Sequence, residues 1–310
     1  MKRLLTIAIL FFAGSTWSQQ DAMYTHYAFN TLSINPGYAG SRDVLTITGL
    51  HRSQWISFPG APVTQTITAH SPVINKSLGA GISLMSDRIG PSRNSGMALD
   101  FSYNLDMEEY GNLAFGLKAG LNMRSDNIAG LTTIETDDPS FEQNIQSQFL
   151  PNFGFGLYYS QPRFYAGFSI PRLLENDLDV NPVVGATGQA SESRHYYFIA
   201  GSMLNLKPDG SLRLKPTTFI KITAGAPVEM DLTALIYYHD LIWAGPMFRT
   251  GDAFGALAGV NISDQFAIGY SFDWSFGNNT GRYNGGSHEL ILRYDFIFNE
   301  KPRVKSSRYF

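Results

Sequence analysis

The segment MALDFSYNLD, residues 97–106, alternates an apolar side chain with a small or polar one at every position, and LAFGLKAGLNM, residues 113–123, repeats the arrangement. A period of two residues is typical of a β-strand, whose successive side chains point to opposite faces, whereas an amphipathic helix has a period of about 3.6. Long strands with one apolar and one polar face are the sequence pattern of a transmembrane β-barrel.

A soluble β-sandwich is the alternative, because its strands also alternate. Sandwich strands usually run about 5 or 6 residues, whereas a strand tilted across a bilayer needs roughly 9 to 11, a length that several segments here reach. The polar faces hold mostly Gly, Ala, Ser and Asn with isolated charges, whereas a soluble sheet would carry many Lys and Glu. Length and composition therefore favour an all-β fold, a transmembrane outer-membrane β-barrel.

We predict about fourteen antiparallel strands, an even number, as a bacterial barrel with both termini in the periplasm requires. The predicted strands are residues 42–52, 62–70, 77–87, 96–106, 111–124, 149–160, 162–170, 194–205, 212–225, 228–239, 241–250, 252–262, 265–276 and 287–298. Short turns such as 107–110 and 263–264 alternate with long connections at 125–148, 171–193 and 277–286, which would lie outside.

The predicted barrel, residues 42–298, has a segment on either side. Residues 1–18 combine a charged start, a short apolar core and small residues, and so predict a secretory signal peptide. Residues 19–41 are not strand-like and carry a turn at 35–37, which predicts a plug-like segment at or inside the periplasmic mouth. For the basic residues 299–310 we expect a solvated periplasmic tail, with a signal read by assembly machinery as the alternative.

Composition excludes several kinds of site. The chain has no cysteine, which excludes disulfides, thiol chemistry and zinc–thiolate sites. It is 44% hydrophobic and 14% aromatic, with 30 glycines and 16% charged residues, as expected of a barrel with aromatic girdles. Removal of Lys2 and Arg3 with the signal peptide would take the formal net charge from −3 to −5, which is too mild to suggest a nucleic-acid partner.

No motif predicts an enzyme. The six histidines include no pair spaced as metal ligands on one strand. Ser287, His288 and Glu289 are adjacent, but neighbours in a strand point to opposite faces and do not converge as a catalytic triad must. The glycine-rich stretches are not followed by a helix, as phosphate binding would require. We therefore expect no catalytic, cofactor-binding or metal-binding residues.

Charged residues at inward positions form a candidate lumen network. They are Asp100, Lys118, Arg124, Asp273, Glu289, Arg293 and Asp295. Their mixed signs favour salt bridges that brace the lumen, because a pore selective for one charge would show rings of one sign. A gated or selective channel is the alternative. The inward faces look too polar for transport of a hydrophobic ligand.

Inward glycines and a group of polar residues suggest where the N-terminal segment packs. Glycine often marks the close approach of another backbone within a strand, and the predicted strands contain Gly79, Gly81, Gly154, Gly156, Gly255 and Gly259. The candidate residues that hold the segment are Asn35, Pro36, His51, Arg52, Gln54 and Trp55. The turn at Asn35 would aim the segment into the barrel, and polar side chains would bind it by hydrogen bonds. Trp55 also suits an interfacial rim, as Phe58 does.

Three stretches carry a resemblance to a known family. They are YTHYAFNTLSINPGYAGS (24–41), LHRSQWISFPGAPVTQTITAHSP (50–72) and GSHELILRYDF (286–296). With them the chain resembles, almost end to end, the PorP/SprF family of the type IX secretion system, outer-membrane barrels of bacteria with gliding motility or surface-protein secretion. The basic tail is the only feature of unusual length.

The resemblance implies a noncatalytic integral barrel of the bacterial outer membrane that works with other type IX secretion components in contact with membrane lipid. In one branch, such a barrel assists secretion or surface anchoring of a partner, such as a large gliding adhesin whose C-terminal domain carries the export signal. In another, it is a core component associated with a periplasmic peptidoglycan-binding protein. A plugged transport channel is the remaining interpretation.

Overall fold

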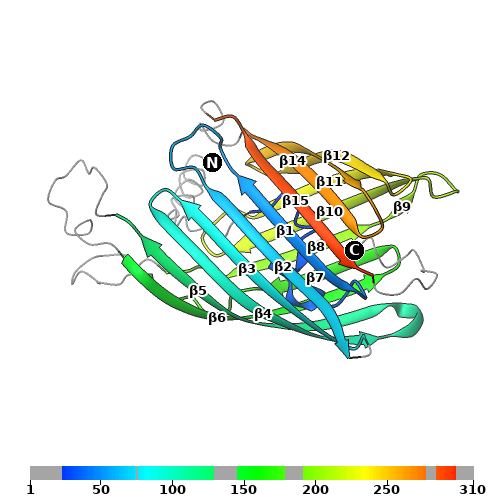
Figure 1. The fold of residues 1–310 in the computed structure, drawn as a ribbon, viewed down its shortest axis with the longest axis horizontal. Helices are drawn as coiled ribbons and strands as arrows, with labels where there is room; N and C mark the ends of the chain where they lie inside the picture. The colour runs from blue at the N-terminus through cyan, green and yellow to red at the C-terminus, as the bar shows by residue number, and fades with distance from the viewer. Residues whose placement is uncertain (1–22, 75, 129–144, 179–190, 277–283, 298–310) are drawn as a thin grey trace, which may run out of the picture.

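The computed structural model describes residues 23–74, 76–128, 145–178, 191–276 and 284–297, and their strands form a closed antiparallel barrel (Figure 1). The strands are β1 (Leu45–Ser53), β2 (Val63–Ile74), β3 (Leu78–Ile89), β4 (Ser92–Asp106), β5 (Asn112–Asp126), β6 (Ile145–Gln161), β7 (Phe164–Ile170), β8 (His195–Ser202), β9 (Leu204–Asn205), β10 (Leu212–Thr223), β11 (Glu229–Tyr238), β12 (Ile242–Arg249), β13 (Ala253–Asn261), β14 (Phe266–Ser275) and β15 (Ser287–Phe296). The expected signal peptide and basic tail lie outside the described residues, as does part of each expected long connection.

The ring contains fourteen strands, so the predicted number is confirmed. The two-residue β9 continues β8, since both pair with β10, and β1 pairs with β15 to close the ring. Closure leaves no unpaired sheet edge in lipid, where no water can satisfy backbone groups. Each predicted strand overlaps an observed one, although some boundaries move: β1 begins at Leu45 and not at 42, and β6 begins at Ile145 and not at 149.

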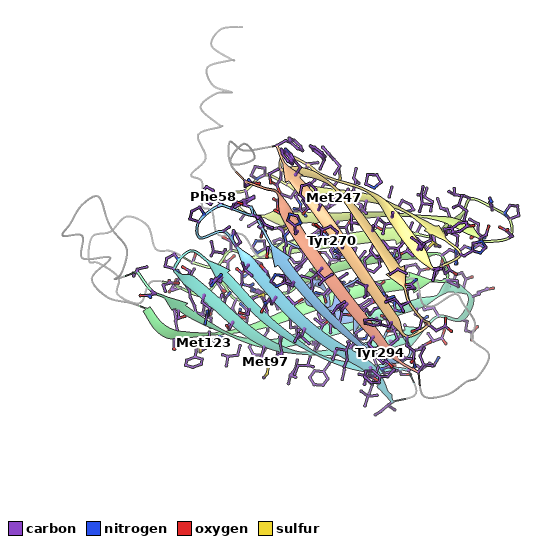
Figure 2. The ribbon with its side chains drawn as sticks, turned by 45° about the horizontal axis from the view of Figure 1, so that its top comes forward. Phe58, Met97, Met123, Met247, Tyr270 and Tyr294 are labelled. Carbon is purple, nitrogen blue, oxygen red and sulfur yellow. The ribbon has the colours of Figure 1, made fainter. Side chains whose placement is uncertain are left out.

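The two faces of each long strand differ as the alternation predicted. On β4 the apolar positions are exposed on the outer surface, and Met97 and Phe101 are 50% and 56% exposed. The intervening Asp100 and Ser102 are buried inside. Figure 2 shows Met97 and Met123 on the outside of the wall. The outer surface of the barrel is therefore the apolar face that lipid covers.

The two ends of the barrel also differ. The turns β2–β3, β4–β5 and β6–β7 are short and lie at the end where β1 begins and β15 ends, which we call the turn end. The longer connections β5–β6, β7–β8 and β14–β15 lie at the opposite end, which we call the loop end. The 3-10 helix η2 (Glu108–Tyr110) lies in the β4–β5 turn. In Figure 1 the strands run diagonally from the loop end at the upper left to the turn end at the lower right.

Residues 23–44 lie inside the ring of strands, and we call them the plug. The plug contains two short helices, α2 (Thr31–Ile34) and η1 (Pro36–Tyr38), and most of its residues are buried. The Asn35 side chain caps η1 by accepting a 2.8 Å hydrogen bond from the Gly37 N–H, and Pro36 opens the helix. In Figure 1 the plug is the dark-blue trace within the barrel.

The hydrophobic core of the protein is the interface between the plug and the inner wall. Tyr27 stacks on Phe219 with ring centroids 5.0 Å apart. Phe29 stacks on Trp243 at 4.6 Å. The inner wall contributes further buried aromatic residues, namely Tyr158, Tyr165, Tyr197 and Tyr237. The inward faces from β6 to β12 therefore carry aromatic side chains, which the plug covers, in addition to the polar residues expected from the sequence.

Glycines on the inner wall make room for the plug. A Cβ atom added at Gly116 would overlap the backbone of Gly37, and one added at Gly156 would overlap the side chain of Asn35. The prediction that inward glycines admit the N-terminal segment is confirmed at Gly79, Gly81 and Gly156. It is wrong at Gly255 and Gly259, where an added Cβ atom would meet β14 and Trp243 of the wall. At Gly154 the neighbouring backbone belongs to the β7–β8 connection instead.

We predict that Gly116→Ala destabilises the folded barrel by about 1–3 kcal/mol, because the added methyl group meets plug backbone that has little freedom to move. The matched control is Gly120→Ala on the same strand, where the added Cβ would lie 3.4 Å from the Ala98 side chain, an ordinary contact. Denaturant unfolding in detergent measures both. Equal stability of the two variants would contradict the prediction.

Candidate functional site

Five buried residues hold the plug near the loop end, and we call them the loop-end latch: Thr25, His26, Arg52, Asp273 and Glu289. The backbone N–H groups of Thr25 and His26 donate to the Glu289 carboxylate at 2.9 and 2.7 Å, and His26 Nδ1 lies 2.7 Å from the same carboxylate. Arg52 Nη1 donates to Thr25 Oγ1 and to Asp273 at 2.8 Å each. The Thr25 hydroxyl donates to Asp273 at 2.6 Å.

The loop-end latch joins the plug to buried charges of the wall, and these charges need the hydrogen bonds that the plug supplies. Arg52, Asp273 and Glu289 come from β1, β14 and β15 and are each 1% exposed. A buried charge is tolerated only when ion pairs and hydrogen bonds replace water. Because Glu289 takes two of its hydrogen bonds from plug backbone, withdrawal of the plug would leave this carboxylate with fewer partners. The latch therefore favours the plugged state.

A second cluster, the turn-end latch, holds the other end of the plug and consists of Arg42, Thr46, Arg293 and Asp295. Arg42 Nη2 donates to Asp295 at 2.9 Å, and the Thr46 hydroxyl donates to the same carboxylate at 2.7 Å. Arg293 Nε lies 3.8 Å from Asp295. A guanidinium is always charged in proteins, so the pair with Asp295 compensates the buried charge of Arg42.

Between the latches, hydroxyl groups of the wall donate to plug carbonyls. Ser169 Oγ donates to the Ile34 carbonyl and Ser102 Oγ to the Ala39 carbonyl, each at 2.6 Å. These bonds satisfy backbone groups that a non-strand segment inside a barrel would otherwise leave unpaired.

Asn30 and Asn35 supply polar contacts from the plug side. The Asn30 side chain bonds both Thr66 and Thr68 of β2 at 3.0 Å. Asn35 Nδ2 donates to the Leu157 carbonyl of β6 at 2.9 Å. These two asparagines therefore join the plug to two separate parts of the wall, β2 and β6.

The structure divides the candidate lumen network into separate clusters. Asp273 and Glu289 belong to the loop-end latch, and Arg293 and Asp295 belong to the turn-end latch. Asp100 and Lys118 form a pair of their own at 3.2 Å, with Lys118 also 3.4 Å from a plug carbonyl. Arg124 pairs with Asp126 at 2.7 Å near the loop end of β5. All seven side chains are inside the barrel, but they do not form one continuous network.

Some of the candidate residues for holding the N-terminal segment contact the plug or belong to it, and others do not. Arg52 and Asn35 bond across the interface between plug and wall, and Pro36 opens η1. His51 is exposed on the outer face, where it bonds Gln65 and Ser53, so its expected contact with the plug is wrong. None of the described hydrogen bonds joins Gln54 or Trp55 to the plug; their backbone N–H groups donate to Pro62 and Ser287.

Sequence reasoning missed several charged residues of the lumen. Arg249 of β12 pairs with Asp231 of β11 at 2.8 Å, and both are 1% exposed. Lys221 and Glu229 pair at 3.3 Å where β10 and β11 meet at the loop end. Strand parity places Lys221, Asp231 and Arg249 inward and was a usable signal. His26 lies in a segment without strand periodicity, so no pattern marked it.

The described residues contain no cluster of three or more potential metal ligands. Ser287 and Glu289 are buried on the inner face, whereas His288 is on the outer face and bonds Tyr270. This separation agrees with the parity argument against a triad. Among the described residues, no helix is long and apolar enough to cross a membrane.

Comparison with known proteins adds one strong match. A family model described as type IX secretion system membrane protein PorP/SprF matches residues 16–294. No curated protein matches the chain.

Solved structures resemble the chain weakly. Omp33 of Acinetobacter baumannii has a TM-score of 0.46 at 10% identity and covers 82% of this chain and 99% of its own. BamA from Haemophilus ducreyi lacking POTRA domains 1–3 has a TM-score of 0.42 at 6% identity, and the match covers 82% of this chain and 70% of BamA. The translocator domain of autotransporter NalP from Neisseria meningitidis has a TM-score of 0.39 at 11% identity, and the match covers 82% of this chain and 88% of that domain.

We predict that Arg52→Ala loosens the plug but leaves the barrel folded. The change leaves two buried carboxylates without their cation, which costs about 3–5 kcal/mol, and protonation or plug movement relieves it. Limited proteolysis of the plug in detergent measures the effect. The neighbouring His51→Ala is the matched control, because His51 is exposed on the opposite face. Unchanged protease resistance of the plug in Arg52→Ala would refute the latch.

Proposed function

Since the chain belongs to the PorP/SprF family of type IX secretion system membrane proteins and is an integral outer-membrane barrel, we propose that it assists secretion or surface anchoring of a partner protein without catalysing a reaction. The partner would be a secreted surface protein, such as a large gliding adhesin whose C-terminal domain carries the export signal. Other type IX secretion components would act with the barrel.

The filled lumen is the observation that supports this function. The plug contacts strands around the ring. It is fixed at the turn end by the Arg42–Asp295 ion pair and at the loop end by hydrogen bonds from Thr25 and His26 to wall carboxylates, so the inside of the barrel is organised around the protein's own chain. A general diffusion pore would instead be expected to keep a water-filled channel through its lumen. A plugged barrel offers its rims and loops to partners, and binding residues are often found on loops.

We expect a tagged copy purified in gentle detergent from its native outer membrane to retain a large secreted surface protein, identified by mass spectrometry. A variant barrel from another family, tagged identically, is the control for nonspecific retention. Recovery of a periplasmic peptidoglycan-binding protein instead would favour the core-component function. Recovery of the barrel alone would contradict both.

We also expect the purified barrel to pass no steady ionic current in planar bilayers, because the plug fills the lumen. Arg52→Ala should add transient openings, whereas His51→Ala should not. A steadily open wild-type channel would favour solute transport and count against anchoring.

A further inference from the structure

The plug runs lengthwise through the barrel, and its direction is opposite to that of β1. Its last residues lie at the turn end, where Arg42 bonds Asp295, the residue before the last residue of β15. Its first described residue, Met23, lies at the loop end, where Lys221 Nζ approaches the Met23 sulfur at 3.5 Å. Lys221 is near the end of β10 and pairs with Glu229, the first residue of β11.

Intermediate contacts follow the same order. The Tyr24 hydroxyl lies 3.7 Å from the Met85 sulfur in the loop-end half of β3. Asn30 bonds Thr66 and Thr68 near the middle of β2. The Gly40 N–H donates to His70 at 3.1 Å, one strand from the turn-end latch. The chain therefore enters the described structure at the loop end and leaves the lumen at the turn end to begin β1.

The loop-end half of the lumen is not completely filled. A cavity of about 110 Å³ lies between the plug and the wall formed by β2 to β6, lined by Tyr24 and Ser33 of the plug and by Ser83, Asn122 and Asn152 of the wall. Met23 is half-buried, whereas Thr25 and His26 are 1% and 0% exposed. Burial of the plug thus decreases toward its N-terminal end, on the side of this cavity.

Outer-membrane barrels place their short turns in the periplasm and their longer loops outside the cell. We propose that the N-terminal end of the plug is presented at the outer mouth of the barrel, where a protein at the cell surface reaches it and periplasmic components do not. This location differs from the periplasmic one that an even-stranded barrel suggests for its N-terminus. It also places the loop-end latch beside the surface-accessible end, so a surface partner has the shorter route to it. The proposal holds whichever partner is bound.

Cysteine labelling in whole cells tests this directly, because the chain has no native cysteine. Ala22→Cys places a thiol next to Met23. Phe58→Cys, at an exposed position of the β1–β2 connection, marks the loop end, and Glu109→Cys, in the exposed turn of η2, marks the turn end. A membrane-impermeant polyethylene glycol maleimide is added to intact cells and to cells with a permeabilised outer membrane, and labelled chains are detected by their gel shift.

The expected result is a gel shift for Ala22→Cys and Phe58→Cys in intact cells and for Glu109→Cys only after permeabilisation. Labelling of Ala22→Cys only after permeabilisation would overturn the proposal, because the N-terminal end would then be periplasmic. Labelling of Ala22→Cys only after denaturation would also overturn it, because the end would be enclosed. The same holds if Phe58→Cys requires permeabilisation, because the loop end would then face the periplasm.

Discussion

Backbone N–H and C=O groups have no water to bond with in a lipid bilayer, so the sheet must close on itself. The pairing of β1 with β15 closes it. Closure assigns every second side chain to lipid and the others to a lumen. The hydrophobic core cannot then form between layers of structure, as in a soluble domain, because the outer face is already committed to lipid. It forms inside the ring, between the wall and a segment of the same chain.

Filling the lumen with chain creates a second requirement, because plug backbone and wall charges are removed from water together. The protein meets it by pairing them: Glu289 accepts N–H groups from the plug, and Ser102 and Ser169 donate to plug carbonyls. These buried wall groups thus have partners on the plug, whereas Arg249 and Asp231 pair with each other within the wall. Such an arrangement is stable when the plug is in place and strained when it leaves, which favours one closed state.

The strands could be predicted because alternation in one strand is a local pattern that lipid enforces, and MALDFSYNLD shows it without reference to any other segment. The plug contacts could not, because they join residues that are far apart in the chain. His26 meets Glu289 only after the ring has closed. His51 and Arg52 are both expected from the sequence to hold the plug, but adjacent residues of a strand point to opposite faces, and only Arg52 lies inside.

The direction of the plug makes the two ends of the lumen differ in how firmly they hold it. At the turn end the plug continues covalently into β1, so it cannot leave the wall there. At the loop end the described contacts between plug and wall are noncovalent, and they concentrate on Thr25 and His26. A ligand that competes for these contacts, or a force applied at the loop end, therefore acts on the noncovalent loop-end latch, which is the weaker of the two attachments. On the proposed orientation, with the loop end outside the cell, a surface partner therefore meets the weaker attachment of the plug first.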